Sequence, residues 1–147
     1  MEIAVLGLGC FWGPEIKFSK IEGVIRTEVG YCGGNTAQTT YKEVCTGNTN
    51  HAEVVKLEFD PKIISYNKIL EFFFDIHDPT SLNFQGPDIG TQYRSEIFYL
   101  SEKQKKIAED IIKLENHKFS GKIVTKLSLL KNYCPAEEYH QRYLEKR

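Results

Sequence analysis

The chain has 147 residues, 27% of them charged, and a net charge of −1 at pH 7. This length is typical of one domain, so we expect residues 1–147 to form a single domain. The near-zero charge excludes electrostatic steering toward nucleic acid or an acidic membrane surface. No apolar run approaches the roughly 18 residues of a transmembrane helix and no signal-peptide pattern opens the chain, so the sequence predicts a cytoplasmic protein.

The cysteines and histidines limit the chemistry. None of the four cysteines belongs to a Cys-x-x-Cys pair: Cys10, Cys32, Cys45 and Cys134. A reducing compartment argues against structural disulfides. The histidines are scattered without the spacing of zinc ligands: His51, His77, His117 and His140. The cysteines therefore serve either in packing or in redox chemistry.

The first stretch places one cysteine between a strand and a helix. Met1–Leu8 is short, apolar and strand-like. Pro14 is tolerated only in the first turn of a helix, so a helix should begin close to Phe11–Gly13. Cys10 then lies at a helix N-terminus, where unpaired N–H groups and the helix dipole favour a thiolate. The alternative is that Cys10 is a small buried hydrophobic side chain, which is the usual role of a lone cysteine near a strand end.

Alternation of apolar residues, helix caps and turn residues predict the remaining elements. In chain order they are a continuation of the first helix to Ile21, a strand at Val24–Tyr31, a long loop at Thr36–Asn50, a strand at His51–Asp60, a helix at Tyr66–His77 capped by Ser65, a second long loop at Thr80–Gln92, a strand at Tyr93–Leu100, a helix from Ser101 to about Phe119, a strand at Ile123–Leu130 and a C-terminal helix at Ala136–Lys146. This order predicts an α+β fold in which helices pack on a mixed sheet.

One carboxylate falls where a strand should be apolar. In the strand at His51–Asp60, Glu53 shares its side with Val55, Leu57 and Phe59. A carboxylate buried there is costly unless it is neutral or paired. The alternative is a frayed strand end that leaves Glu53 in water.

A series of stretches resembles, in order, the signature motifs of the A-type peptide methionine sulfoxide reductases. They are Gly9–Glu15, Gly30–Gly34, Tyr41–Gly47, His51–Val55, His77–Thr80, Gly90–Ser95 and Pro135–Gln141. One such motif can arise by chance, but so many in order are a specific signal, and the likeness covers nearly the whole chain. The resemblance implies a two-layer α/β sandwich with a ferredoxin-like mixed sheet and packed helices.

The resemblance also implies an activity and a site. The reaction is reduction of the S-epimer of methionine sulfoxide, free or in proteins, and so the repair of oxidised proteins. Position by position, Cys10 matches the nucleophile of the family and Glu53 its acid. The matching substrate-binding residues are the polar Tyr41, Asp88 and Tyr93, and Phe11 and Trp12, which match the pocket for the ε-methyl group.

These residue types suit a sulfoxide. Its sulfur is open to attack once the oxygen is protonated, and Glu53 can supply the proton if burial keeps it neutral near pH 7. Tyr41 and Tyr93 can hydrogen-bond the same oxygen without becoming charged. The Cys10 thiolate attacks the sulfur, methionine leaves, and Cys10 becomes a sulfenic acid. This chemistry requires no metal and no organic cofactor.

A second thiol must then reduce the sulfenic acid. Many family members carry recycling cysteines in a Gly-rich C-terminal tail, which this sequence lacks. Cys134 is the first candidate for the resolving residue, Cys45 and Cys32 are alternatives, and an external thiol acting directly on Cys10 stays open. The expected partner is a thioredoxin-type reductant, and we expect a monomer.

The second long loop departs from the pattern of the family. It holds Phe84 and Pro87 where the family more often has polar residues. The expected consequence is a change in how peptide substrates sit, with Asp88 and Tyr93 still in place.

Two other functions remain as alternatives. A thiol peroxidase or cysteine hydrolase is one, and a hydrolase needs a histidine base such as His51 or His77 near Cys10. A module that binds oxidised methionine without turnover is the other, and it requires Cys10 to be dispensable for binding.

Overall fold

A six-stranded mixed sheet lies at the centre of the structure, a computed structural model that describes residues 1–146. The strand order is β7-β6-β1-β3-β2-β8, with β6 and β7 parallel and all other neighbours antiparallel. The strands are β1 (Glu2–Leu8), β2 (Val24–Cys32), β3 (Ala52–Phe59), β6 (Ser95–Tyr99), β7 (Lys126–Leu129) and β8 (Cys134–Pro135). The predicted α+β fold with a mixed sheet is confirmed.

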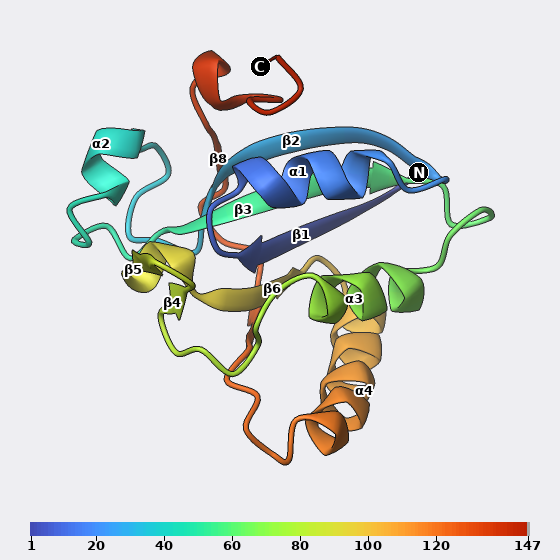
Figure 1. Cartoon of the computed structure of the whole chain (residues 1–147). Coiled ribbons are helices and arrows are strands. Elements are labelled where there is room, and N and C mark those ends of the chain that lie inside the picture. Colours follow the sequence, from blue (N-terminus) through green and yellow to red (C-terminus); the bar gives the residue numbers. More distant parts are fainter. Residues whose placement is uncertain (147) are drawn as a thin grey trace.

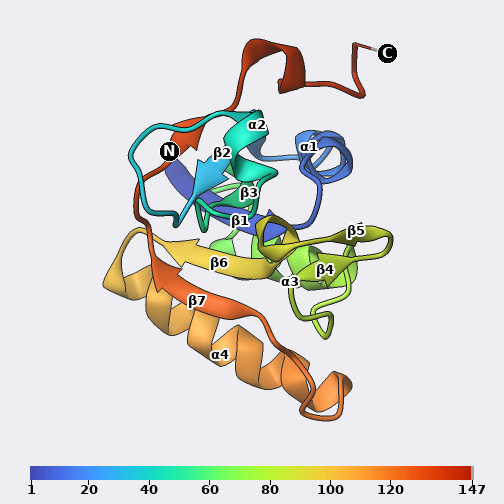
Figure 2. The same ribbon diagram turned by 90° about the vertical axis from the view of Figure 1, so that its left-hand side faces the viewer.

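Three of the four helices in residues 1–146 pack on the sheet as a second layer, and the shortest helix, α2 (Tyr41–Val44), lies in the first long loop. The helices are α1 (Trp12–Ser19), α2 (Tyr41–Val44), α3 (Tyr66–Asp75) and α4 (Glu102–Lys118), with 3-10 turns η1 (Thr91–Tyr93) and η2 (Glu138–His140). Figure 1 shows α1 and α3 in front of the sheet, and Figure 2 shows α4 beside β6 and β7. Strands β1, β2, β3 and β6 with α1 and α3 make the β-α-β-β-α-β arrangement of ferredoxin-like folds. Among the helices of residues 1–146, none is long and apolar enough to cross a membrane.

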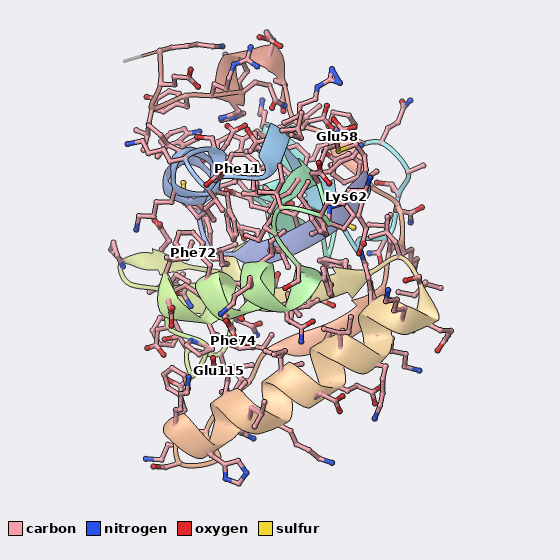
Figure 3. The ribbon with its side chains drawn as sticks, turned by 90° about the vertical axis from the view of Figure 1, so that its right-hand side faces the viewer. Phe11, Glu58, Lys62, Phe72, Phe74 and Glu115 are labelled. Carbon is pink, nitrogen blue, oxygen red and sulfur yellow. The ribbon has the colours of Figure 1, made fainter. Side chains whose placement is uncertain are left out.

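The main core fills the space between the helices and one face of the sheet. Phe18 of α1 meets Phe72 of α3 edge-on, with ring centroids 5.1 Å apart. Figure 3 shows Phe72 on the α1 side of α3 and Phe74 on the side toward α4. The buried sheet side chains of this core include Leu6, Val29, Val55, Leu57 and Ile97. A smaller cluster on the opposite face comprises Val5, Cys32, Ala52, Val54 and Phe98, covered by Leu130 and Tyr133.

The register of β3 puts Glu53 on the helix face of the sheet. Glu53 lies on the same face of β3 as three buried core residues, Val55, Leu57 and Phe59, and only 1% of its own surface is exposed. It lies opposite Tyr31 of β2, which is also fully buried. The alternation read from the sequence is therefore confirmed, and the strand end is not frayed.

Local signals set the helix starts. Pro14 lies in the first turn of α1. Ser65 accepts a hydrogen bond from the Lys68 backbone N–H (3.2 Å), and Ser101 accepts one from that of Gln104 (3.1 Å). The Gln104 side chain accepts from the Leu100 N–H (3.0 Å) instead of completing a capping box on Ser101.

Both long loops contain short elements that the sequence does not reveal. The first holds α2, whose N-cap Thr40 accepts from the Glu43 N–H at 3.2 Å. The second holds a hairpin of β4 (Phe84–Gln85) and β5 (Asp88–Ile89) and then η1. The Gln85 side chain anchors this hairpin through two hydrogen bonds to the backbone of Asp78 (3.1 and 2.5 Å).

The predicted C-terminal helix at Ala136–Lys146 is wrong. Instead, β8 adds to the edge of β2, and only η2 is helical. The Gln141 side chain accepts from the Val29 N–H and donates to the Val29 carbonyl, both at 2.9 Å. Glu15 accepts from the Arg142 N–H at 2.7 Å. These bonds to distant elements outweigh the weak preference of a polar segment for helix.

Candidate active site

Cys10 lies in the turn between β1 and α1, with its side chain partly exposed. The preceding Gly9 has φ +99°, and a Cβ there would lie 2.9 Å from the Gln85 side chain, so glycine lets the β4–β5 hairpin approach. Burial raises the pKa of the Cys10 thiol to about 11, although a hydrogen bond from the Trp12 backbone opposes the change. The helix N-terminus therefore does not make Cys10 a thiolate in the free protein, because the loss of solvation is larger.

Glu53 is a buried carboxyl beside this turn. Its Oε1 accepts a hydrogen bond from the Phe11 backbone N–H at 3.3 Å. Its Oε2 is buried and has no hydrogen-bond partner within residues 1–146. Burial raises the pKa of Glu53 to about 8, and the negative charge of Asp88 adds to the rise. At neutral pH the carboxyl is mostly protonated, and its unpaired Oε2 belongs to a side chain that is hydrogen-bonded to the residue after Cys10.

Tyr41, Tyr93 and Asp88 each interact electrostatically with Glu53. Burial raises the pKa of Tyr93 to about 12, and further contributions come from charge on four neighbours: Glu53, Cys45, Asp88 and Cys10. Burial also raises the pKa of Tyr41, and the neighbours that add to that rise are Cys45, Tyr93 and Glu53. The charge of Asp88 in β5 opposes ionisation of both Cys10 and Glu53. The structure thus brings together the polar residues that the sequence assigns to substrate binding.

Phe11 and Trp12 directly follow Cys10 and begin a cluster of aromatic rings, here called the aromatic wall, that also includes Tyr31, His140 and Tyr143. Phe11 is buried, with its ring centroid 5.8 Å from that of Tyr31. Trp12 stacks on Tyr143 with centroids 3.8 Å apart, and its indole N–H donates to His140 Nδ1 at 3.1 Å. Both aromatic residues that the sequence assigns to the methyl pocket directly follow Cys10 in the chain, and Trp12 is fixed by the C-terminal segment.

Sequence reasoning missed the part of this segment that supports the site. The Glu137 carboxylate accepts from the Tyr41 backbone N–H and from the Tyr31 hydroxyl, both at 2.9 Å. Burial favours a higher pKa for Glu137, but the hydrogen bonds from Tyr41 and Tyr31 outweigh it and lower the pKa. The ring of His140 lies 4.5 Å from that of Tyr41. The only sequence signal was the motif at Pro135–Gln141, which gave no roles to its members.

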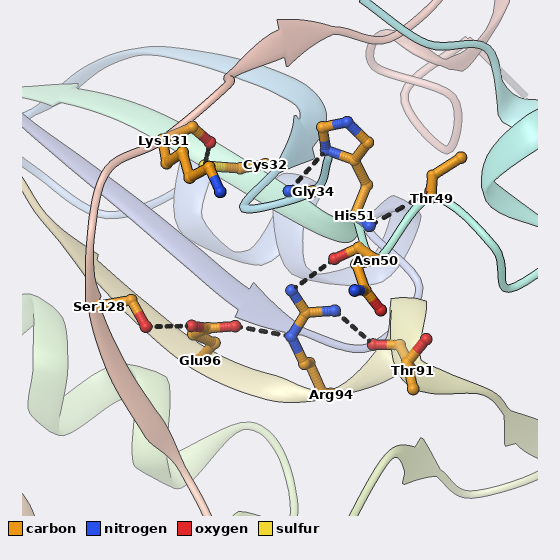
Figure 4. Close-up of polar contacts among 10 residues, drawn as sticks. All are labelled: Cys32, Gly34, Thr49, Asn50, His51, Thr91, Arg94, Glu96, Ser128 and Lys131. Carbon is orange, nitrogen blue, oxygen red and sulfur yellow. Dashed lines mark hydrogen bonds and ion pairs between the residues drawn. The ribbon is translucent and has the colours of Figure 1, made fainter. Parts of the chain in front are cut away.

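A buried ion pair ties the two loops of the site together. Arg94 pairs with Glu96 at 2.6 Å and donates to the carbonyls of Thr91 (2.9 Å) and Asn50 (2.8 Å) (Figure 4). Thr91 begins the turn that ends at Tyr93, and Asn50 precedes the strand that carries Glu53. Arg94 therefore fixes Tyr93 and the start of β3 relative to each other, which the sequence did not reveal.

The other cysteines occupy three different settings. Cys32 is buried in the small cluster on the opposite face of the sheet and donates to the Lys131 carbonyl (3.3 Å). Cys134 lies in β8 opposite Tyr31. Cys45 follows α2 and is exposed. All four cysteines are free. Within residues 1–146, no three His, Cys, Asp or Glu side chains group closely enough to hold a metal ion.

The two histidines considered as the base of a hydrolase, His51 and His77, are both hydrogen-bonded to other parts of the fold. His77 is held between the Phe73 carbonyl (2.5 Å) and the Ser95 hydroxyl (2.7 Å). His51 accepts from the Gly34 backbone N–H at 3.1 Å (Figure 4). Both rings thus hold the fold together.

Comparison with known proteins identifies the family. The family model "Peptide methionine sulfoxide reductase" matches residues 2–147. The chain is 82% identical over 147 residues, the full length of both chains, to a peptide methionine sulfoxide reductase MsrA of Pelagibacter ubique. It resembles reduced Mxr1 of Saccharomyces cerevisiae with a TM-score of 0.94 at 41% identity, covering 99% of this chain and 85% of that one. Mxr1 in complex with Trx2 matches with a TM-score of 0.68 at 28% identity, covering 97% and 84%. The chain therefore belongs to the peptide methionine sulfoxide reductase family of enzymes.

Proposed function

We propose that this enzyme reduces the S-epimer of methionine sulfoxide, free or in proteins, by attack of the Cys10 thiolate on the sulfoxide sulfur. The observation that carries the proposal is Glu53. It is a carboxyl with only 1% of its surface exposed and a pKa of about 8. Its one hydrogen-bonded oxygen contacts the residue after Cys10. A proton donor is therefore held, at neutral pH, against the residue that follows the proposed nucleophile.

Glu53 delivers the proton that makes the oxygen a leaving group. Oε2 is free to point a proton at the sulfoxide oxygen, and Tyr41 and Tyr93 donate hydrogen bonds to the same atom. Both tyrosines stay neutral, because burial raises their pKa. In a pocket shielded from water, such donors stabilise the charge that develops on oxygen more strongly than water does.

Substrate helps to ionise Cys10. The free thiol has a pKa of about 11, largely because burial removes the solvation of the thiolate. A bound sulfoxide turns the positive end of its S–O dipole toward Cys10 and so favours the thiolate. The thiolate adds to the sulfoxide sulfur as the oxygen takes the proton of Glu53. The hydroxyl then passes to the Cys10 sulfur as the new sulfur–sulfur bond and the original sulfur–oxygen bond break, so a thiol and a sulfoxide become a sulfenic acid and a thioether.

The aromatic wall selects the methyl group. Phe11 and Trp12 directly follow Cys10 and belong to the main apolar core, and a methyl next to sulfur makes apolar and sulfur–aromatic contacts with such rings. With the oxygen directed to Glu53 and the methyl to the wall, only one epimer leaves the sulfur facing Cys10.

A second thiol closes the cycle by reducing the sulfenic acid, with Cys134 as the candidate predicted from the sequence. The complex of yeast Mxr1 with Trx2 supports a thioredoxin-type dithiol as the final reductant. Such a partner is consistent with a location in the cytoplasm, and that location stays a prediction.

A single-turnover assay tests this function. Reduced protein is mixed with each epimer of methionine sulfoxide without reductant, and we expect one methionine per chain from the S-epimer and none from the R-epimer. In Cys10→Ser, we expect no methionine but retained binding, detected through fluorescence of Trp12, the only tryptophan. Turnover of a peroxide or an ester without methionine formation would favour the peroxidase or hydrolase alternative.

A further inference from the structure

His140 is a buried side chain that none of the steps above uses. Only 2% of its surface is exposed, and its ring lies among the rings of the aromatic wall. The centroid of the imidazole is 5.3 Å from that of Phe11, 5.7 Å from that of Trp12 and 4.5 Å from that of Tyr41. One imidazole therefore packs against both rings assigned to the methyl pocket and against one of the tyrosines assigned to the substrate oxygen.

The backbone that carries His140 is held on both sides. The His140 N–H donates to the Glu137 carbonyl at 2.9 Å. The Glu137 carboxylate in turn accepts from the Tyr41 backbone N–H. On the other side, the Gln141 side chain makes two hydrogen bonds to the backbone of Val29 in β2. Contacts of the neighbouring residues thus place the imidazole, and its ring nitrogens are left for another task.

The hydrogen bond to Trp12 determines where the imidazole carries its proton. An indole N–H can only donate, so His140 Nδ1, at 3.1 Å, accepts with its lone pair. Burial lowers the pKa of His140, although the charge of Glu137 opposes the change, so the ring is neutral at neutral pH. A neutral imidazole with a lone pair on Nδ1 carries its proton on Nε2.

The second ring nitrogen of His140 gains nothing for stability. Nε2 is buried and has no hydrogen-bond partner within residues 1–146. A buried N–H without an acceptor is unfavourable, whereas a phenylalanine ring fills apolar surroundings without that cost. Packing alone therefore does not account for a histidine at this position. What the imidazole supplies, and a phenylalanine ring lacks, is the acceptor for Trp12.

We propose that His140 is a positioning residue, which fixes the Trp12 indole as a wall of the methyl pocket by accepting its N–H at Nδ1. The inference rests on the proposed function, in which Trp12 contacts the methyl group of the substrate. Trp12 is partly exposed, and Tyr143 stacks on its indole with centroids 3.8 Å apart. Stacking restrains the tilt of the indole, and the directional hydrogen bond to His140 fixes its rotation within the ring plane.

The position of the imidazole proton is measured in the wild-type protein, without any variant of altered stability. Long-range proton–nitrogen NMR correlations of the imidazole distinguish a ring protonated on Nε2 from one protonated on Nδ1. The His140 signals are those that disappear in His140→Phe. We expect the Nε2 form at neutral pH. A proton on Nδ1 overturns the proposal, and this result does not depend on activity.

Single-turnover kinetics with methionine S-sulfoxide test the effect on binding. Asparagine carries its amide oxygen where histidine has Nδ1, and glutamine carries its amide where histidine has Nε2. His140→Phe and His140→Gln should raise the half-saturating concentration about 3- to 10-fold, the loss expected for one hydrogen bond, and change the limiting rate much less. His140→Asn should stay closer to the wild type. The matched control His117→Phe replaces an exposed histidine of α4 and should change neither quantity.

Ethionine S-sulfoxide separates a positioning role from a structural one. Its ethyl group adds one methylene to the group that the methyl pocket receives. A loosened Trp12 accommodates the larger group more easily, so the preference for methionine over ethionine sulfoxide should fall in His140→Phe and His140→Gln. A general loss of folded structure lowers turnover of both substrates alike and leaves the preference unchanged.

The outcomes distinguish this proposal from the proposed function. Wild-type half-saturation in both His140→Phe and His140→Gln overturns the role of His140, as does an equal loss in His140→Asn. An unchanged preference between the two sulfoxides also overturns it and leaves His140 a structural residue. Absence of methionine from the wild type overturns the reductase function instead, whatever the position of the imidazole proton.

Discussion

Replacing Glu53 with glutamine tests whether a buried neutral carboxyl drives the reaction. Glutamine keeps the shape and a hydrogen-bond donor, but it cannot transfer a proton. General acid catalysis contributes about 10²–10⁴-fold, so the first turnover of Glu53→Gln should slow by that factor. Binding of methionine sulfoxide, followed by Trp12 fluorescence, should change much less.

The same change has a calculable effect on stability. Glu53 has a pKa of about 8 in the folded protein, against an ordinary value of 4.5. Below pH 4.5 both folded and unfolded chains hold the proton. Between these values only the folded chain holds it, so unfolding releases a proton and wild-type stability falls by about 1.4 kcal/mol per pH unit. The full loss above pH 8 is about 5 kcal/mol, and Glu53→Gln avoids it.

Urea unfolding of both proteins measures this difference. From pH 5 to pH 8, the free energy of unfolding of Glu53→Gln should rise relative to wild type by about 4 kcal/mol. The matched control is Glu58→Gln, on the other side of the same strand and paired with Arg26, which should show no such rise. If the difference in free energy of unfolding between Glu53→Gln and wild type does not change with pH, Glu53 is not a buried neutral carboxyl. Full activity of Glu53→Gln at neutral pH would refute its role as the acid.

Three further experiments test the candidate active site. Cys10→Ser should abolish methionine formation and leave the circular dichroism spectrum unchanged; residual turnover would contradict the nucleophile. Iodoacetamide at pH 7 should alkylate the exposed Cys45 faster than Cys10, because a pKa of about 11 keeps Cys10 a thiol. The alkylation rate of Cys10 should rise as the pH approaches 11. Equal alkylation rates of the two cysteines at pH 7 would contradict the raised pKa of Cys10. Glu137→Gln weakens the hydrogen bonds to Tyr41 and Tyr31, so it should lower the free energy of unfolding in urea by about 1–3 kcal/mol. The same change should raise KM more than it lowers kcat. The control Glu138→Gln alters an exposed side chain and should change the free energy of unfolding little.

Short-range patterns in the sequence determined the scaffold. The apolar run before Cys10 and the proline after it specify β1, the turn and α1, because each signal acts within one turn of chain. The two-residue period of β3 put Glu53 on the buried face, because adjacent side chains of a strand must point to opposite sides.

Only the tertiary structure decided the state of Cys10 and the path of the C-terminus. A helix start predicts an easier thiolate, but desolvation by residues distant in sequence outweighs it. The segment at Ala136–Lys146 favours a helix locally, yet Gln141 finds stronger partners on β2. Burial and long-range hydrogen bonds depend on which segments meet, and a local pattern does not contain that information.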